Sequence, residues 1–242
     1  MTKRAVVFAG RNGLDFIDLR MSVIRIPEVS LRIRQAQSVF DSLGLQKSVN
    51  LMSLITADDE QFFRNIGLKG LLAAIVQVGL YDRYLRTQRA SDFLVGNTNG
   101  DSALLVAAGK LSFEEMIRTS QAVTALRPVE PVQPVVAQPV PILSGLSLTE
   151  YGAFVSTTND QGMRIYEPFK STSMDLKSIV SSLHIDNGVE LFINIGPASA
   201  LRVSDYRMIG TGDLEALDSI ELDPMLTWFW NELENLKTGT LN

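Results

Sequence analysis

Short apolar runs recur along the chain, and several end at a glycine. Residues 5–8 form a continuous run, Ala-Val-Val-Phe, that passes into Gly10, which is typical of a buried parallel strand entering a loop. Residues 93–95 repeat this pattern before another glycine, and residues 151–155 and 190–195 contain similar runs. We therefore expect four strands, with 190–195 as the last of them.

Helical spacing of apolar residues fills the intervals between these runs. In residues 28–43 the apolar positions fall on one face, and Gly44 follows as a stop signal. Another helix is predicted to begin after Ser112, which would be its N-cap, because Glu115 occupies the third helical position of a capping box. Further helices are predicted at residues 66–85, 102–109 and 174–183, and in a C-terminal segment that starts at Asp223 and Pro224.

Strands that alternate with helices indicate an α/β fold, with a mostly parallel sheet covered by helices on both faces. One stretch breaks the alternation, because prolines recur between residues 128 and 141 and disfavour a helix. We expect residues 128–144 to be an extended linker. Residues 1–127 and 145–242 would then be two parts of the same core, the second including the C-terminal helix.

Composition excludes several classes of chemistry. The 242 residues include no cysteine and one histidine, so disulfides, thiolate nucleophiles and Cys-ligated metals are ruled out, and no metal site is expected. A net charge of -5 argues against nucleic-acid binding. No apolar run reaches the roughly 20 residues of a membrane span, and no signal-like segment follows Met1, so we expect a cytoplasmic protein without membrane contact.

The charges are unevenly distributed. Residues 1–40 hold seven basic and three acidic groups, whereas residues 205–242 hold two basic and eight acidic groups. Two solvated surfaces would explain this difference. The alternative is that the basic segment meets an acidic partner.

The segment that starts at Phe93 is the most informative for chemistry. A strand, the turn Gly96-Asn-Thr98-Asn-Gly100 and a helix make the arrangement of a nucleophile elbow, in which small residues leave the central side chain exposed. Backbone N–H groups at such a helix start favour developing negative charge. The five-residue pattern alone is weak evidence, because glycine-rich turns of this kind are common.

The longer string of residues 93–115 resembles the elbow of the malonyl-CoA:acyl-carrier-protein transacylase family, where Gly-His-Ser-Leu-Gly-Glu precedes a helix reading Ala-Leu-Val-Ala-Ala-Gly-x-Leu-Ser-Phe-Glu. Residues 7–13 are similar to the family's opening strand and Phe-Pro-Gly-Gln-Gly-Ser-Gln loop. Residues 188–201 resemble its late strand and Gly-Pro turn. In all, the resemblance reaches most of residues 5–118 and 174–202.

This resemblance implies an acyltransferase core similar to that of the α/β-hydrolases. It implies acyl-CoA or acyl-phosphopantetheine as ligand, no cofactor, and an acyl carrier protein or another pathway enzyme as partner. The family's small ferredoxin-like lobe has no room in residues 127–159, so we expect this subdomain to be deleted.

Several positions depart from the family. Thr98 stands where the family has its nucleophilic serine, Asn97 replaces the preceding histidine, and Arg11 aligns with the oxyanion-hole glutamine. Counting from the elbow places Val123 at the arginine that holds the malonyl carboxylate. The only histidine, His184, matches no catalytic position of the family, and a helix-terminal structural role is the expectation for it.

The resemblance and its departures lead to a hypothesis of a catalytically impaired transacylase-like protein of a fatty-acid or polyketide-type pathway, acting as a binding or scaffold subunit. Thr98 would be a degenerate nucleophile. Gly10, Arg11 and Asn99 would line an anion-binding cleft. A carrier protein would meet a subset of four basic residues, Arg20, Arg25, Arg32 and Arg34.

Two alternatives stay open. Thr98 would act as nucleophile of a slow acyltransferase or thioesterase if Asp101 or a partner chain supplied the base. Otherwise the protein would be an interaction module unrelated to the cleft, docking a partner or a second copy of itself in a homo-oligomer through the helix that carries residues 228–230.

Overall fold

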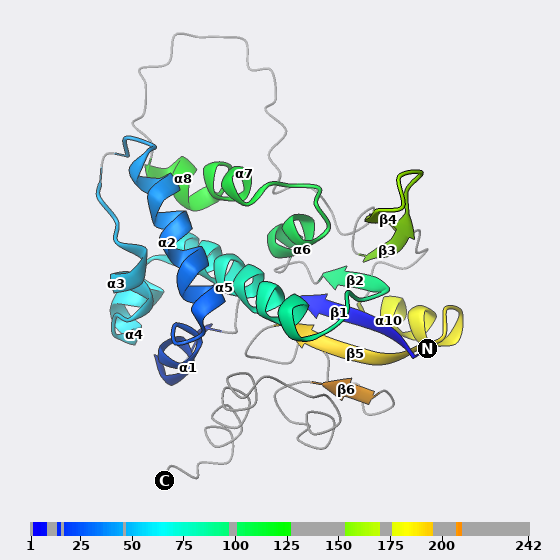
Figure 1. The fold of residues 1–242 in the computed structure, drawn as a ribbon. Coiled ribbons are helices and arrows are strands. Elements are labelled where there is room, and N and C mark those ends of the chain that lie inside the picture. The colour runs from blue at the N-terminus through cyan, green and yellow to red at the C-terminus, as the bar shows by residue number, and fades with distance from the viewer. Residues whose placement is uncertain are drawn as a thin grey trace.

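A sheet of six described strands forms the centre of the protein (Figure 1). The computed structural model describes residues 2–8, 14–15, 17–45, 47–96, 101–126, 153–169, 176–195 and 207–209. The strands are β1 (Lys3–Phe8), β2 (Phe93–Gly96), β3 (Ala153–Thr158), β4 (Arg164–Pro168), β5 (Val189–Ile195) and β6 (Arg207–Ile209). Their order in the sheet is β4-β3-β2-β1-β5-β6.

The sheet is mixed. Strands β2, β1, β5 and β6 run parallel to one another, whereas β3 pairs antiparallel with both β2 and β4. The prediction of parallel pairing is therefore confirmed for the centre of the sheet and wrong for the β3–β4 hairpin. Strand β4 was not predicted, because only Tyr166 of its five residues is buried. The prediction that residues 190–195 form the last strand is wrong as well, since β6 follows β5.

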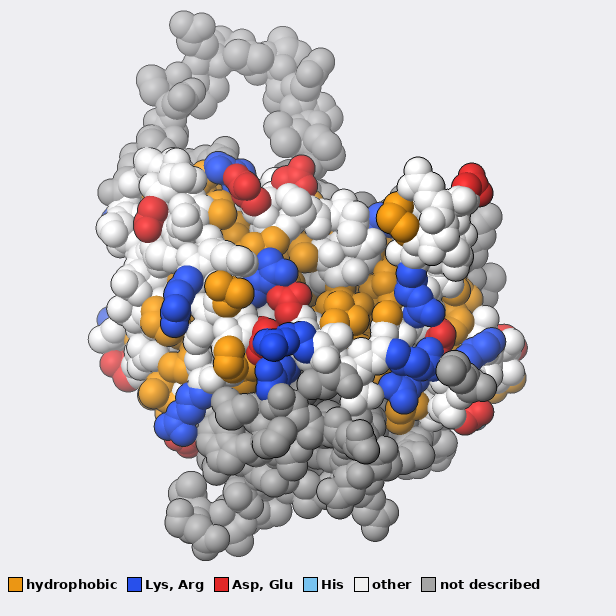
Figure 2. Space-filling view, viewed as in Figure 1, with side chains coloured by type: hydrophobic (Ala, Val, Ile, Leu, Met, Phe, Trp, Pro, Cys, Tyr) orange, Lys and Arg blue, Asp and Glu red, His pale blue; other side chains and the backbone are white. Residues whose placement is uncertain are grey.

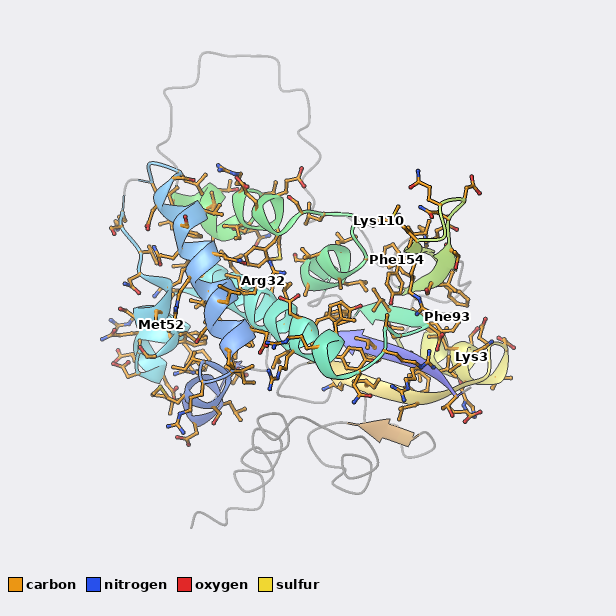
Figure 3. All side chains as sticks on the ribbon, viewed as in Figure 1. Lys3, Arg32, Met52, Phe93, Lys110 and Phe154 are labelled. Atoms are coloured by element: carbon orange, nitrogen blue, oxygen red, sulfur yellow. The ribbon has the colours of Figure 1, made fainter. Side chains whose placement is uncertain are left out.

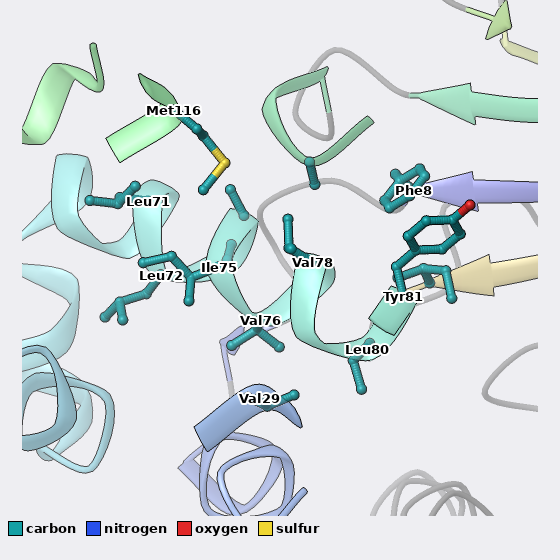
Figure 4. Close-up of a cluster of buried hydrophobic side chains, with 14 of the residues drawn as sticks. Phe8, Val29, Leu71, Leu72, Ile75, Val76, Val78, Leu80, Tyr81 and Met116 are labelled. Atoms are coloured by element: carbon teal, nitrogen blue, oxygen red, sulfur yellow. The ribbon is translucent and has the colours of Figure 1, made fainter. Parts of the chain in front are cut away.

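Helices cover both faces of the sheet, as the sequence predicted. Helix α10 (Leu176–Ile185) lies on one face, where its apolar residues form a cluster with Ala5, Val7 and Val95. Helices α5 (Ile66–Thr87) and α6 (Asp101–Ala107) lie on the other face. There Phe8 packs against Tyr81 of α5, with the ring centroids 5.5 Å apart (Figure 4). The α/β fold class is therefore confirmed.

Helix α2 (Pro27–Asp41) packs on the outer side of α5. Its predicted apolar face is confirmed, because Val29, Ile33, Ala36 and Phe40 are all buried. The two helices approach very closely at Gly79, where an added Cβ would lie only 2.6 Å from the Cα of Val29. Gly44, the predicted stop, has a left-handed φ of 58°.

Short helices complete the described structure. They are α1 (Ile17–Val23), α3 (Leu51–Ile55), α4 (Asp59–Phe63), α7 (Phe113–Arg118) and α8 (Gln121–Leu126). Helix α7 begins with the predicted capping box, in which the Ser112 hydroxyl accepts from the Glu115 N–H and the Glu115 carboxylate accepts from the Ser112 N–H. None of the helices in the described ranges is long and apolar enough to cross a membrane.

Several predicted features fall outside the described residues. These include the linker at residues 128–144, with the expected loss of the small lobe, and the C-terminal helix that starts at Asp223. The proposed division of the chain around the linker therefore stays a prediction.

Candidate functional site at the carboxyl edge of the sheet

Three parallel strands end side by side at one edge of the sheet, which we call the carboxyl edge (Figure 1). Phe8, the last residue of β1, is in register with Gly96 of β2 and with Ile195 of β5. The loop after β1, the turn after β2 and the turn after β5 therefore leave from adjacent positions. Ligands of open α/β sheets bind outside the carboxyl ends of strands, so this edge is the candidate site.

The connection between β2 and α6 contains the predicted nucleophile elbow. Only residues 97–100 connect the end of β2 to the first residue of α6. A Cβ on Gly96 would lie 2.6 Å from Cδ2 and 3.3 Å from Cβ of the buried Leu104, so glycine allows α6 to pack tightly against the end of the strand. Thr98 and Asn99 belong to this turn and lie outside the described residues, as do Gly10 and Arg11 in the first loop.

Arg20 anchors the chain directly after the first loop. Its guanidinium, which is fully buried, donates to the carbonyl of Leu14 at 2.9 Å and to the carbonyl of Ile55 at 3.0 Å. It also forms an ion pair of 2.8 Å with Asp59 and lies 4.1 Å from the centroid of the Phe62 ring. Leu14, which directly follows residues 9–13, is thus tied to the region of α3 and α4.

This burial corrects one prediction about the basic segment. Arg20 cannot belong to an exposed docking surface, because its side chain has no solvent-accessible area. A buried guanidinium that donates to several carbonyls stabilises the fold locally, since each otherwise unpaired carbonyl would cost free energy. A second interaction connects the residues before α1 with α4 and α5. Lys69 forms an ion pair with Asp15 and lies 4.5 Å from the ring centroid of Phe63.

The other predicted arginines differ in exposure and in their partners. Arg32 forms an ion pair of 2.6 Å with Asp82 and lies 4.7 Å from the ring centroid of Phe113. Arg25 and Arg34 are exposed. Figure 3 shows Lys3 and Arg32 well apart, at the start of β1 and on the outer helical layer. The basic surplus of residues 1–40 is therefore divided between different parts of the molecule.

His184 lies at the wrong end of the sheet to serve the elbow. It is an exposed residue in the last turn of α10, and its Nδ1 atom is 2.7 Å from the carbonyl oxygen of Val189. Val189 begins β5, and the strand reaches the carboxyl edge six residues later, about 20 Å away at 3.3 Å per residue. The structure therefore gives His184 a helix-terminal role, as the sequence predicted.

One buried polar residue near the site received no role in the sequence analysis. Asn194 is fully buried in β5, directly before Ile195, and is in register with Val7. Its signal in the sequence was an amide within an otherwise apolar strand. Within the described ranges, no group of three or more His, Asp or Glu residues is placed to hold a metal ion.

Two solved structures share the fold over nearly the whole chain. A malonyl CoA-acyl carrier protein transacylase from Clostridium perfringens superposes with a TM-score of 0.55 and 12% identity, covering 98% of this chain and 100% of that one. An acyl carrier protein S-malonyltransferase from Vibrio cholerae O1 biovar eltor gives a TM-score of 0.55 and 12% identity, over 90% and 99% of the two chains. These similarities show that the chain has a transacylase-like fold.

Other comparisons are weaker. The transacylase MCAT from Streptococcus pneumoniae is 23% identical over 48% of this chain, with a TM-score of 0.40, and the match spans only 36% of that protein. No protein-family model matches the sequence. No curated protein matches it either.

Proposed function

We propose that the protein is a transacylase-like subunit that binds an acyl-CoA or acyl-phosphopantetheine group at the elbow and transfers acyl groups slowly or not at all. Its role would be that of a binding or scaffold subunit in a fatty-acid or polyketide-type pathway. The observation that carries this proposal is the shared carboxyl edge, where the ends of β1, β2 and β5 meet beside the elbow.

The reduced activity follows from the position of the only histidine. A threonine hydroxyl needs a base to remove its proton, and the base and nucleophile act as one unit. His184 lies about 20 Å from the carboxyl edge, counted along β5. Removal of one member of such a unit costs several orders of magnitude in rate. His184 is therefore too far from the carboxyl edge to act as this base.

Binding would depend on groups that do not require a base. Arg11 and the backbone N–H groups around Gly10 and Asn99 would attract a carboxylate or phosphate group. The buried Arg20 supports this role indirectly, because its bond to Leu14 fixes the end of the loop that carries Gly10 and Arg11.

A calorimetric titration with an acidic acyl carrier protein tests the proposed partner. We expect weak binding that decreases as salt rises, because exposed charges are screened. Arg11→Glu and Arg34→Glu should each weaken binding several-fold. Arg64→Glu is the matched control, since Arg64 is also an exposed arginine but pairs with Glu60 on α4. No binding at low salt, or an affinity unchanged by salt and by both reversals, would refute the proposed partner.

A further inference from the structure

Three arginines from separate elements meet where β1, β2 and β4 begin, which we call the amino edge of the sheet. Arg4 belongs to β1, Arg89 follows α5, and Arg164 begins β4. Arg164 donates through Nη1 to the carbonyl oxygens of residues 90–91 at 3.1 and 2.9 Å. Arg4 donates through Nη1 to the side chain of Gln88 at 3.1 Å. All three guanidiniums thus converge on the segment that leads into β2.

Positive charge is in excess at this position. Asp92 is the carboxylate of the group, and Arg89 approaches its two oxygens at 3.4 and 3.3 Å. Asp92 also accepts from the backbone N–H of Arg4 at 2.9 Å. Neither Arg4 nor Arg164 forms an ion pair with a carboxylate among the described residues. Arg32 of α2, by contrast, forms an ion pair with Asp82 on the neighbouring helix α5.

Besides Asp92, two further acidic groups of the described residues lie at the margins of this cluster. Asp160 occupies the tip of the β3–β4 hairpin, and Glu190 lies at the start of β5 on the other side, next to the position of Lys3. Figure 2 shows blue side chains gathered on the right of the molecule, with one red patch among them and further red side chains above and below. The local field between the margins is therefore positive.

The guanidiniums of Arg89 and Arg164 are held in place and keep donors available. A guanidinium has five N–H donors, and the bonds of Arg164 use only its Nη1 atom. Arg164 is exposed, and the Arg89 side chain retains 33% of its accessible area. Because backbone carbonyls and Asp92 already fix the side chains, a partner would need to order them little further.

We propose that Arg4, Arg89 and Arg164 form a docking surface for an acidic segment of another protein. Guanidinium groups bind carboxylates in a bidentate manner, which suits a segment with several Asp or Glu residues. Large exposed apolar residues accompany the arginines, Leu85 at 42% and Met163 at 55% exposure, and such a mixture is typical of protein interfaces. A long nucleic acid is disfavoured by the net charge of -5.

This inference does not rest on the proposed function. The surface lies at the opposite end of the strands from the elbow, so a partner bound there would leave the carboxyl edge accessible. The test uses a probe that carries no phosphopantetheine and no acyl group, and its failure would leave the proposed ligand of the elbow unaffected.

Fluorescence anisotropy with a short labelled peptide of alternating Glu and Ala tests the surface. We expect binding at low ionic strength, and no binding of the same peptide with Gln in place of Glu. The double variant Arg89→Gln/Arg164→Gln should weaken binding about tenfold, since two exposed charge pairs are lost. The double variant Arg64→Gln/Arg118→Gln removes the same net charge from the residue after α4 and from α7, and it should leave the affinity unchanged.

Three results would overturn the inference. The first is absence of peptide binding at low ionic strength, and the second is equal weakening in both double variants, which would indicate a general charge effect. The third is displacement of the peptide by an equal concentration of inorganic phosphate, which would indicate a small-anion site. If the first double variant fails to fold by circular dichroism, Arg164→Gln alone replaces it, because that side chain is exposed and bonds only to two carbonyls.

Discussion

Replacement of Glu28 by glutamine is expected to destabilise the protein by about 3 kcal/mol at neutral pH, the cost of removing one member of a buried ion pair. Glu28 is buried in the first turn of α2 and accepts from Arg83 at 3.1 Å and from Arg86, both on α5. The Arg83 side chain is only 9% exposed, so its charge would remain buried after the replacement. Urea unfolding monitored by circular dichroism gives the free-energy difference.

The same variant should change the response to acid. Burial alone would raise the pKa of Glu28, but hydrogen bonds from its own backbone N–H and from Arg86 and Arg83 outweigh burial and hold the pKa below its ordinary value. A lowered folded-state pKa gives stability that is present above the unfolded-state pKa and lost as pH falls through the folded-state value. We therefore expect Glu28→Gln to lose less stability than the wild type on acidification below about pH 5.

Arg86→Gln provides the control for this interaction. The Arg86 side chain is 67% exposed, so its removal should cost far less than that of the buried carboxylate. Equal stability of Glu28→Gln and wild type at neutral pH, with the same dependence on acid, would show that the ion pairs of Glu28 with Arg83 and Arg86 contribute nothing.

Thr98→Ser alone is expected to leave malonyl transfer to a carrier protein at the level of Thr98→Ala. The serine would restore the family's nucleophile and relieve the crowding of a β-branched side chain in a tight turn, but it supplies no base. A missing base leaves the rate about three or more orders of magnitude below that of an intact nucleophile and base. The measurement is the initial rate of carrier-protein malonylation, and rapid transfer by Thr98→Ser would show that a base is present.

The long elements were predictable because their apolar periods are strong. The helix expected at residues 66–85 and the strand at 93–95 appear as α5 and β2 within two residues at each end. Short helices were missed although local signals existed, since Asn50 and Asp58 each accept from a backbone N–H three residues on, as N-caps do. The antiparallel pairing of β3 was unpredictable from its own residues, because it depends on the hairpin with β4.

The site was predictable only where it is local in sequence. The elbow is one continuous segment, so its strand and helix, confirmed as β2 and α6, follow from glycine positions and spacing, whereas its turn stays a prediction. Arg20 shows the opposite case, because its partners Leu14, Ile55 and Asp59 come from three separate segments, and no local pattern distinguishes a buried arginine from an exposed one. The arginines of the amino edge could not be predicted for the same reason. Arg4 and Arg164 are far apart in sequence, and the order of strands in the sheet brings them to the same edge.

Incubation of the protein with radiolabelled malonyl-CoA, followed by denaturation and counting of protein-bound label, tests the central claim most directly. The central claim is that the elbow binds an acyl group without forming an efficient acyl-enzyme. It predicts label that is retained under native conditions and lost on denaturation, with the same result for Thr98→Ala. Label that survives denaturation in near-equimolar amount and disappears in Thr98→Ala would contradict it, because it would identify Thr98 as an active nucleophile.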